Sequence, residues 1–231
     1  MKVIISLACS MFVFAGIVTA QPDSDPVLQG SATYIMPQTA IDAEIGGRVV
    51  VGISVDDTGK PTAAALIIGP MWPCGTKPVK ALEDLSTTLV STMTKLKFAP
   101  AIKNGKPVVA NIGLTLELKN PKLEPKPAEI DPETGKPRPR LVSGGVINGK
   151  ATYLPKPTYP EAAKPNRDGG PVNVQVLISE EGNVLRAGAI SGATTLQLAS
   201  REAACGAKFS PTKLAGSAVK VSAVVTYNFI P

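Results

Sequence analysis

Histidine is absent from this sequence of 231 residues. Imidazole is the usual base beside a nucleophilic serine or cysteine, and it is the commonest nitrogen ligand of metal ions in proteins. Its absence argues against hydrolytic and metal-dependent sites of the usual kind. We therefore expect a protein that is not an enzyme and that has no catalytic residue, no metal site and no cofactor.

Aromatic residues are scarce, with five Phe, four Tyr and one Trp, whereas the chain has 22 Pro and 21 Gly. Proline and glycine interrupt regular structure, so long helices and strands are not expected. The charge balance of 24 Lys and Arg against 18 Asp and Glu gives a net charge of only +6. Because nucleic-acid binding needs a concentrated basic surface, we expect no nucleic-acid partner.

The first twenty residues differ in composition from the rest of the chain. Lys2 is their only charged residue, the segment 3–18 is almost entirely apolar, and Val18-Thr19-Ala20 has the small residues of a signal-peptidase site. This order predicts a cleaved secretory signal over residues 1–20. An uncleaved membrane anchor is the alternative, because the apolar run is close to the lower length limit of a spanning helix.

Removal of the signal leaves two cysteines, Cys74 and Cys205. In an oxidising compartment an even number of cysteines permits a disulfide. The alternative is that Cys205 is a buried small apolar residue and that Cys74 is a free thiol in a loop. The sequence leaves both open.

An internal repeat organises the mature chain. Ala32-Thr33-Tyr34-Ile35 recurs as Ala151-Thr152-Tyr153-Leu154, and Lys97-Phe98-Ala99-Pro100 recurs as Lys208-Phe209-Ser210-Pro211. The first copy has additional residues, and the Pro-rich region around 70–78 is the expected place of the insertion.

Each copy is predicted to run strand, turn, strand, helix, strand. Apolar residues alternate along 172–178 and 219–229, which is the period of a strand with one buried face. In the first copy Leu82, Leu85 and Leu89 form one apolar stripe of a helix. In the second we expect Leu196, Ala199 and Ala203 to face inward. The fold class is therefore α+β, with a short antiparallel sheet and a helix on one face in each copy.

These patterns give the domain boundaries. The first copy spans 32–118 and the second spans 151–231. Residues 119–150 between them include six prolines and many charged residues, which predicts an extended linker.

Several motifs of the second copy occur in the order found in one family. They are Pro157-Thr158-Tyr159-Pro160, Gly170-Pro171-Val172, Phe209-Ser210-Pro211 and the closing Tyr227-Asn228-Phe229. Residues 155–230 strongly resemble the TonB C-terminal domain family. The first copy resembles a degenerate form, because it lacks the Tyr-Pro pair and carries the insertion. Two small TonB C-terminal-like domains are therefore expected.

The resemblance implies a periplasmic protein that binds a peptide of an outer-membrane transporter, or another envelope protein, as an added strand on the edge of its sheet. The final strand and the segment before it would form the site. Its candidate residues are Lys156, Tyr159, Pro160, Val219, Lys220, Ser222, Val224, Thr226 and Asn228.

Two alternatives remain. In the first, the chain is a true TonB energy transducer. Its anchor would then be atypical, because the Ser-x-x-x-His anchor pattern of the family cannot occur without histidine. In the second, the chain is a structural envelope protein whose sheet edges pair between copies or between chains, including a homodimer formed by edge pairing.

Overall fold

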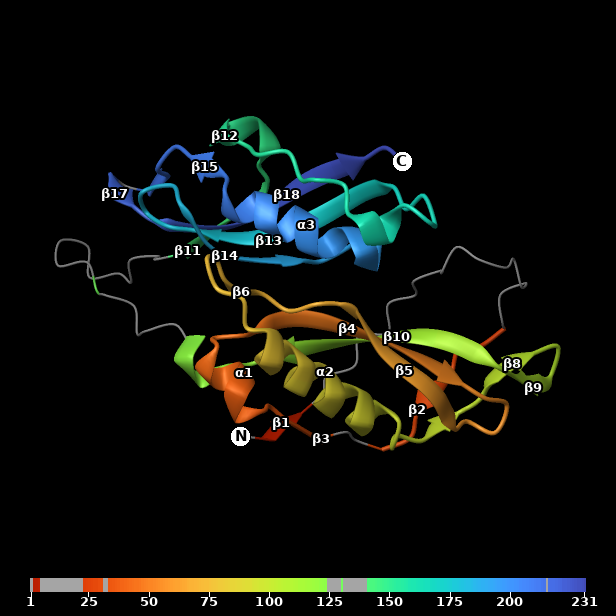
Figure 1. Cartoon of the computed structure of the whole chain (residues 1–231). Helices are drawn as coiled ribbons and strands as arrows, with labels where there is room; N and C mark the ends of the chain where they lie inside the picture. The colour runs from red at the N-terminus through yellow and green to blue at the C-terminus, as the bar shows by residue number, and fades with distance from the viewer. Residues whose placement is uncertain (1, 5–22, 31–32, 124–129, 131–140, 215) are drawn as a thin grey trace. The chain divides into compact units, whose positions relative to one another are not determined.

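The computed structural model describes residues 2–4, 23–30, 33–123, 130, 141–214 and 216–231 (Figure 1). The chain divides into two compact units. Unit 1 contains Met1–Gly69 and Pro78–Asn120, and unit 2 contains Pro70–Lys77 and Pro121–Pro231. The segment 70–77 is thus contributed to unit 2 from within the sequence of the predicted first copy.

The predicted signal, residues 1–20, lies outside the described residues except for strand β1 (Lys2–Ile4). This strand pairs antiparallel with β3 (Thr33–Ile35). None of the helices in the described ranges has both the length and the apolar character needed to cross a membrane.

Unit 1 is built on an antiparallel sheet of three strands in the order β10-β4-β5. These are β4 (Gly47–Val55), β5 (Pro61–Ile68) and β10 (Ala110–Leu118). Helix α2 (Val79–Met93) buries Ala81, Leu85, Leu89 and Met93, and α1 (Gln38–Asp42) contacts α2. The core of the unit therefore lies on the face of the sheet that carries the alternating valines of β4.

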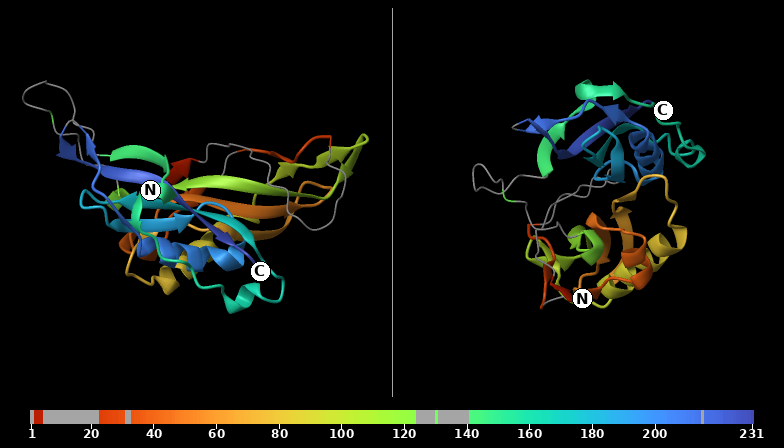
Figure 2. Two further views of the ribbon diagram at one scale, coloured as in Figure 1. Left: turned by 90° about the horizontal axis from the view of Figure 1, so that it is seen from above. Right: turned by 90° about the vertical axis from the view of Figure 1, so that its left-hand side faces the viewer.

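Short strands complete unit 1. β2 (Val27–Leu28) pairs with β7 (Phe98–Ala99), and β8 (Ala101–Lys103) forms a hairpin with β9 (Lys106–Val108) at one end of the unit (Figure 2). The strand β6 (Trp72–Pro73) and the 3-10 turn η1 (Pro121–Leu123) belong to unit 2.

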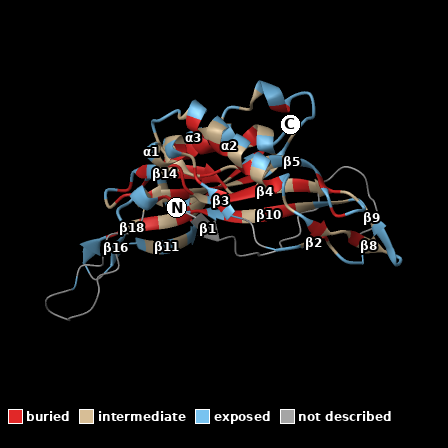
Figure 3. Ribbon diagram, turned by 90° about the horizontal axis from the view of Figure 1, so that it is seen from below, coloured by how far each residue is buried: buried red, intermediate tan, exposed pale blue. Residues whose placement is uncertain are grey.

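Unit 2 has a five-stranded sheet in the order β11-β18-β13-β14-β6. Its strands are β11 (Leu141–Val146), β13 (Gly170–Ile178), β14 (Val184–Ala189), β18 (Lys220–Phe229) and β6. Helix α3 (Thr194–Cys205) packs on one face, against β13 and β14. Buried residues follow the strands and the inner side of the helices (Figure 3).

The remaining elements of unit 2 are short. They are η2 (Asn148–Lys150), β12 (Ala151–Tyr153) paired with β15 (Lys208–Phe209), η3 (Glu161–Ala163), and β16 (Lys213–Leu214) paired with β17 (Ser217–Ala218).

Corresponding strands of the two sheets pair in the same register. The final strand of each unit pairs with the first long strand at nine successive positions, for example Leu116 with Val49 and Tyr227 with Val172. A glycine closes the following hairpin in each unit, because a Cβ at Gly59 or at Gly182 would lie within 2 Å of a backbone carbonyl oxygen. The repeat seen in the sequence is therefore also a repeat of strand pairing.

Three expectations differ from the structure. The insertion of 70–78 lies mostly in unit 2, and the predicted linker 119–150 contains β11 and η2, so only part of it remains a connection. On α3, Ala199 is half-buried, whereas Arg201 is buried. Partners far away in the sequence account for β11, for the segment 70–77 and for the burial of Arg201.

Candidate strand-binding site

The edge of β18 that faces away from β13 is occupied by the chain itself. β11 runs parallel to β18 from the pair Leu141–Lys220 to the pair Val146–Val224. Beyond β11, the amide of Ile147 donates to the carbonyl oxygen of Val224 at 3.0 Å. The first half of the predicted peptide-binding edge therefore already carries an extended segment.

The Asn148 side chain extends this closure by one residue pair. Its Nδ2 donates to the carbonyl oxygen of Thr226 at 2.6 Å, and the amide of Thr226 donates to its Oδ1 at 2.8 Å. The side-chain amide thus satisfies the same two groups that a neighbouring strand would. Asn228, the next residue of β18 with the same orientation, is exposed.

Close approach of β11 to the sheet depends on a glycine. A Cβ at Gly144 would lie 2.9 Å from Cγ1 of Val221 and 3.3 Å from Cβ of Ala223. The pairing register shifts here, between Ser143 and Gly145. A groove of about 500 Å³ lies beside this segment, and its lining includes Ile147, Lys150, Ile178, Phe209, Pro211 and Val221.

The candidate side chains along β18 are only partly accessible. Val219, just before the strand, is buried, whereas Lys220, Ser222, Val224 and Thr226 are half-buried. Ser222 accepts a hydrogen bond from Nε2 of Gln175 at 3.3 Å, and the Thr226 hydroxyl donates to Oδ1 of Asn173 at 2.7 Å. These polar side chains bind to β13 within the sheet, so they do not project as free contacts.

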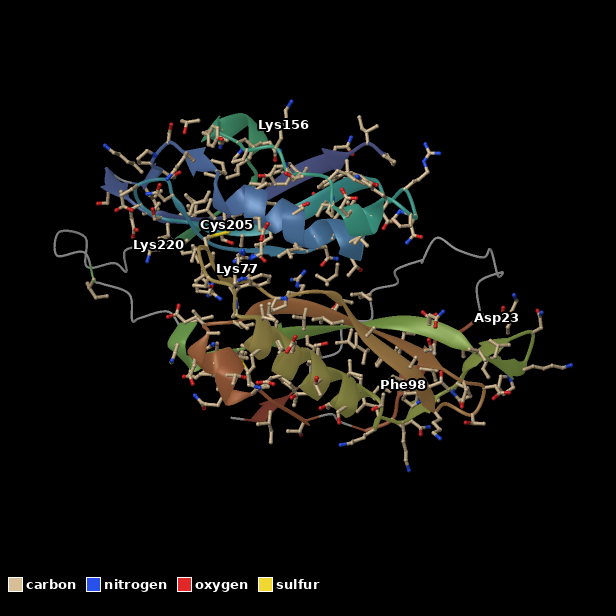
Figure 4. The ribbon with its side chains drawn as sticks, viewed as in Figure 1. Asp23, Lys77, Phe98, Lys156, Cys205 and Lys220 are labelled. Carbon is tan, nitrogen blue, oxygen red and sulfur yellow. A yellow bond between two sulfur atoms is a disulfide. The ribbon has the colours of Figure 1, made fainter. Side chains whose placement is uncertain are left out.

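The lead-in residues do not form one surface with Lys220. The Tyr159 hydroxyl donates to the carbonyl oxygen of Asp168 at 2.7 Å, and its ring meets Phe229 edge-on at 6.1 Å. Tyr159 thereby fixes the loop before η3 to the end of β18. Pro160 is half-buried at the start of η3, and Lys156 is exposed and lies well apart from Lys220 (Figure 4).

The opposite edge of the sheet is also covered. The segment 70–77, which we call the clip, contains β6 and pairs antiparallel with β14. The amide of Cys74 donates to the carbonyl oxygen of Leu185 at 2.9 Å. Gly188 is required opposite the clip, because a Cβ there would lie 2.6 Å from the carbonyl oxygen of Pro70.

A disulfide fixes the clip to α3. Cys74 and Cys205 are bonded, with their Cα atoms 5.5 Å apart (Figure 4). Of the two arrangements that the sequence leaves open for these cysteines, the structure has the bridge. It lies within unit 2, because Cys74 belongs to the clip.

A buried cation, which no local pattern in the sequence predicts, completes the attachment. Arg201 of α3 donates to the carbonyl oxygens of Trp72 at 3.1 Å, Pro73 at 2.9 Å and Ala187 at 3.2 Å. Its guanidinium carbon lies 3.7 Å from the centre of the Trp72 ring. Burial lowers the pKa of Arg201 to about 10, so the group remains charged at neutral pH.

Within the described ranges, no three His, Cys, Asp or Glu residues come together in a way that could hold a metal ion. The main feature of unit 2 is a sheet in which both outer strands, β18 and β14, pair with an added segment. Each edge holds a segment from elsewhere in the chain.

Residues 155–231 match the family model of the Gram-negative bacterial TonB protein C-terminal. The match supports a TonB C-terminal domain in this part of the chain. The TonB C-terminal match includes β13, β14, α3 and β18, but both edge segments, β11 and the clip, lie outside it. No curated protein and no solved structure matches the chain.

Proposed function

We propose that the chain is a non-catalytic, periplasmic protein-binding module that takes up an extended segment of a partner as an added strand at β18. The partner is a peptide of an outer-membrane transporter or another envelope protein. The match over residues 155–231 supports a TonB-like role in envelope transport. The lack of histidine supports the non-catalytic part of the proposal.

The pairing of β11 with β18 carries this proposal. β11 lies outside the matched residues, yet it is held on the edge by backbone pairing, with Gly144 allowing its close approach. A strand edge accepts many sequences, because main-chain hydrogen bonds supply most of the affinity. The partner would therefore exchange with β11 at the same edge.

Replacement of β11 by the partner segment costs the free energy of releasing β11 from β18, and the hydrogen bonds of Asn148 contribute to this cost. A tethered segment has an effective concentration in the millimolar range, on the order of 1 mM for a short flexible connection. The apparent affinity of the partner falls by the fraction of molecules in which the edge is open. Because Asn148 holds Thr226 through two hydrogen bonds, its removal should raise that fraction.

The test uses a photo-crosslinking amino acid in place of Asn228, which is exposed next to the closed part of the edge. The same amino acid in place of Leu198, exposed on α3, is the control position. We expect an envelope protein to be captured from position 228 and not from position 198. Asn148→Ala should increase this capture.

Proline variants then decide whether the backbone makes the contact. Val224→Pro or Thr226→Pro removes an outward N–H and should abolish capture, whereas Val224→Ala, Lys220→Ala and Ser222→Ala should change it little. Circular dichroism must show that the proline variants are folded. Capture that survives Val224→Pro but is lost in Lys156→Ala would refute strand addition and place the contact in the segment before Tyr159.

A structural role is the second candidate, because the chain closes both edges of the unit 2 sheet with its own segments. In that case position 228 should capture nothing, with or without Asn148→Ala. The energy-transducer alternative requires the apolar segment to remain in the membrane. Intact-mass measurement separates it, since our proposal expects a soluble chain that begins at Gln21.

A further inference from the structure

The equivalent strand edge in unit 1 lacks the cover that β11 provides in unit 2. β10 pairs with β4 on one side, and no other strand in the described ranges pairs with it. β18 has the same register on its own neighbour but is covered by β11. The two units thus present the same edge, which β11 occupies in unit 2 and which no described segment occupies in unit 1.

The backbone orientation shows which groups of β10 are available. The Thr62 hydroxyl donates to the carbonyl oxygen of Ser54 at 3.3 Å, so this carbonyl turns toward β5 and away from β10. Ser54 lies opposite Asn111 in the ladder. In an antiparallel pair, Asn111 and every second residue after it, including Thr115 and Glu117, then direct their N–H and C=O groups away from β4.

The same parity is seen directly in unit 2. Thr226 occupies the register position that Thr115 has in unit 1, and its N–H and C=O groups bind Asn148 outside the ladder. Among the described residues before β3, no segment pairs with β10. Instead, β2 pairs with β7 and Ser24 pairs with Ile102.

Apolar surface is also less covered along β10. Val221 and Ala223, which lie beside β11, are 6% and 3% exposed. Their counterparts in unit 1 are Ala110 and Ile112, and both are only half-buried. In unit 2, Val142 of β11 lies beside Val221, the counterpart of Ala110. An apolar side chain beside Ala110 would bury the equivalent surface of unit 1.

We propose that β10 is a second strand-accepting site, which binds an extended peptide segment of a partner protein parallel to it, with an apolar residue of that segment beside Ala110. Direction and chemistry follow from β11, whose Val142 packs on the unit 2 core. The proposal relies on strand addition, as the proposed function does, but not on exchange at β18. A chain with both sites would bind two extended segments.

The test uses a fluorescently labelled synthetic peptide of residues 141–148, Leu-Val-Ser-Gly-Gly-Val-Ile-Asn, added to the full chain. At β18 this peptide competes with tethered β11 at an effective concentration on the order of 1 mM, so at lower concentrations it should bind β10. We expect saturable binding by fluorescence anisotropy. Thr115→Pro should weaken it by about tenfold or more, because one main-chain hydrogen bond is lost and the ring clashes with the peptide.

Thr115→Ala is the matched control, since it keeps the N–H, and it should change binding by no more than about twofold. Hydrogen exchange on the unaltered chain gives a second measurement. The amides of Thr115 and Glu117 should exchange rapidly in the free chain and slowly with saturating peptide. This measurement still decides the question if Thr115→Pro does not fold.

Three results would overturn the proposal. Binding that survives in folded Thr115→Pro but is lost in Thr226→Pro would place the peptide at β18, which leaves the proposed function standing and removes this one. No binding at about 1 mM peptide, the limit of weak specific affinity, would remove the site. Dimerisation in sedimentation velocity that Thr115→Pro abolishes would assign the edge to a second copy of the chain.

Discussion

The disulfide between Cys74 and Cys205 should supply a large share of the stability of unit 2. The two cysteines are 131 residues apart in the sequence. Closing a loop of this length lowers the entropy of the unfolded chain by an amount worth about 5 kcal/mol at 25 °C. The loop includes residues 78–120, which belong to unit 1. If unit 1 stays folded, the flexible part of the loop is shorter, and the stabilisation by the disulfide falls by only about 0.4 kcal/mol.

The test compares the parent chain with Cys74→Ala/Cys205→Ala, both beginning at Gln21, in urea. Trp72 is the only tryptophan and lies in the clip against Arg201, so its fluorescence reports release of the clip. We expect the free energy of unfolding of unit 2 to fall by about 2–5 kcal/mol, the usual range for removal of a native disulfide. Circular dichroism followed in parallel shows whether clip and sheet unfold together.

A reductant provides the control. Dithiothreitol should shift the parent to the midpoint of the double variant and leave the variant unchanged. A loss below about 1 kcal/mol would refute the reasoning, because the bridge would then place no effective constraint on the unfolded chain.

Three further predictions concern buried groups of unit 2. Gly188→Ala places a methyl group 2.6 Å from the Pro70 carbonyl oxygen, so it should destabilise unit 2 by about 1–3 kcal/mol and alter Trp72 fluorescence. Unchanged fluorescence would contradict docking of the clip on β14. Arg201→Met leaves the clip carbonyl groups without their donor and should lower the free energy of unfolding, measured in urea, by about 3 kcal/mol. An unchanged free energy would contradict this and would show that the cost of desolvating the cation offsets its hydrogen bonds. Burial raises the pKa of Tyr227 to about 12, above its unfolded value of about 10, so the stability it contributes is present below pH 10 and is lost as pH rises through 12. Tyr227→Phe should therefore flatten the fall in unfolding free energy between these pH values, and an equally steep fall would contradict the assignment.

Local patterns in the sequence predict the central strands and helix α2 well. The alternation along 172–178 and 219–229 corresponds to β13 and β18, and the stripe of Leu85 and Leu89 is the buried face of α2. These elements are predictable because each has one apolar face and a period that only one kind of element satisfies. The hairpin glycines are predictable for a similar reason, since their position in a short polar turn is local.

The edge segments could not be predicted in this way. β11 includes two glycines and the clip has prolines on both sides of Trp72, compositions that favour loops. Their strand structure comes from partners more than 70 residues away, β18 for β11 and β14 for the clip. Burial of Arg201 likewise depends on carbonyl groups of the clip, and nothing near it in the sequence indicates a cation in the core.

The order of synthesis gives the clip a further consequence. During synthesis, residues 70–77 are made long before β14 and α3, which supply the strand pairing, the Arg201 hydrogen bonds and the disulfide that hold them. Until β14 is present, β6 has no strand of unit 2 to pair with. If the chain is exported as proposed above, oxidation that keeps pace with export would reach Cys74 long before Cys205, so the native bridge must form late or be reached by exchange. The clip therefore becomes fixed only when most of the chain has been made, and a chain that ended before α3 would leave Cys74 without its disulfide partner.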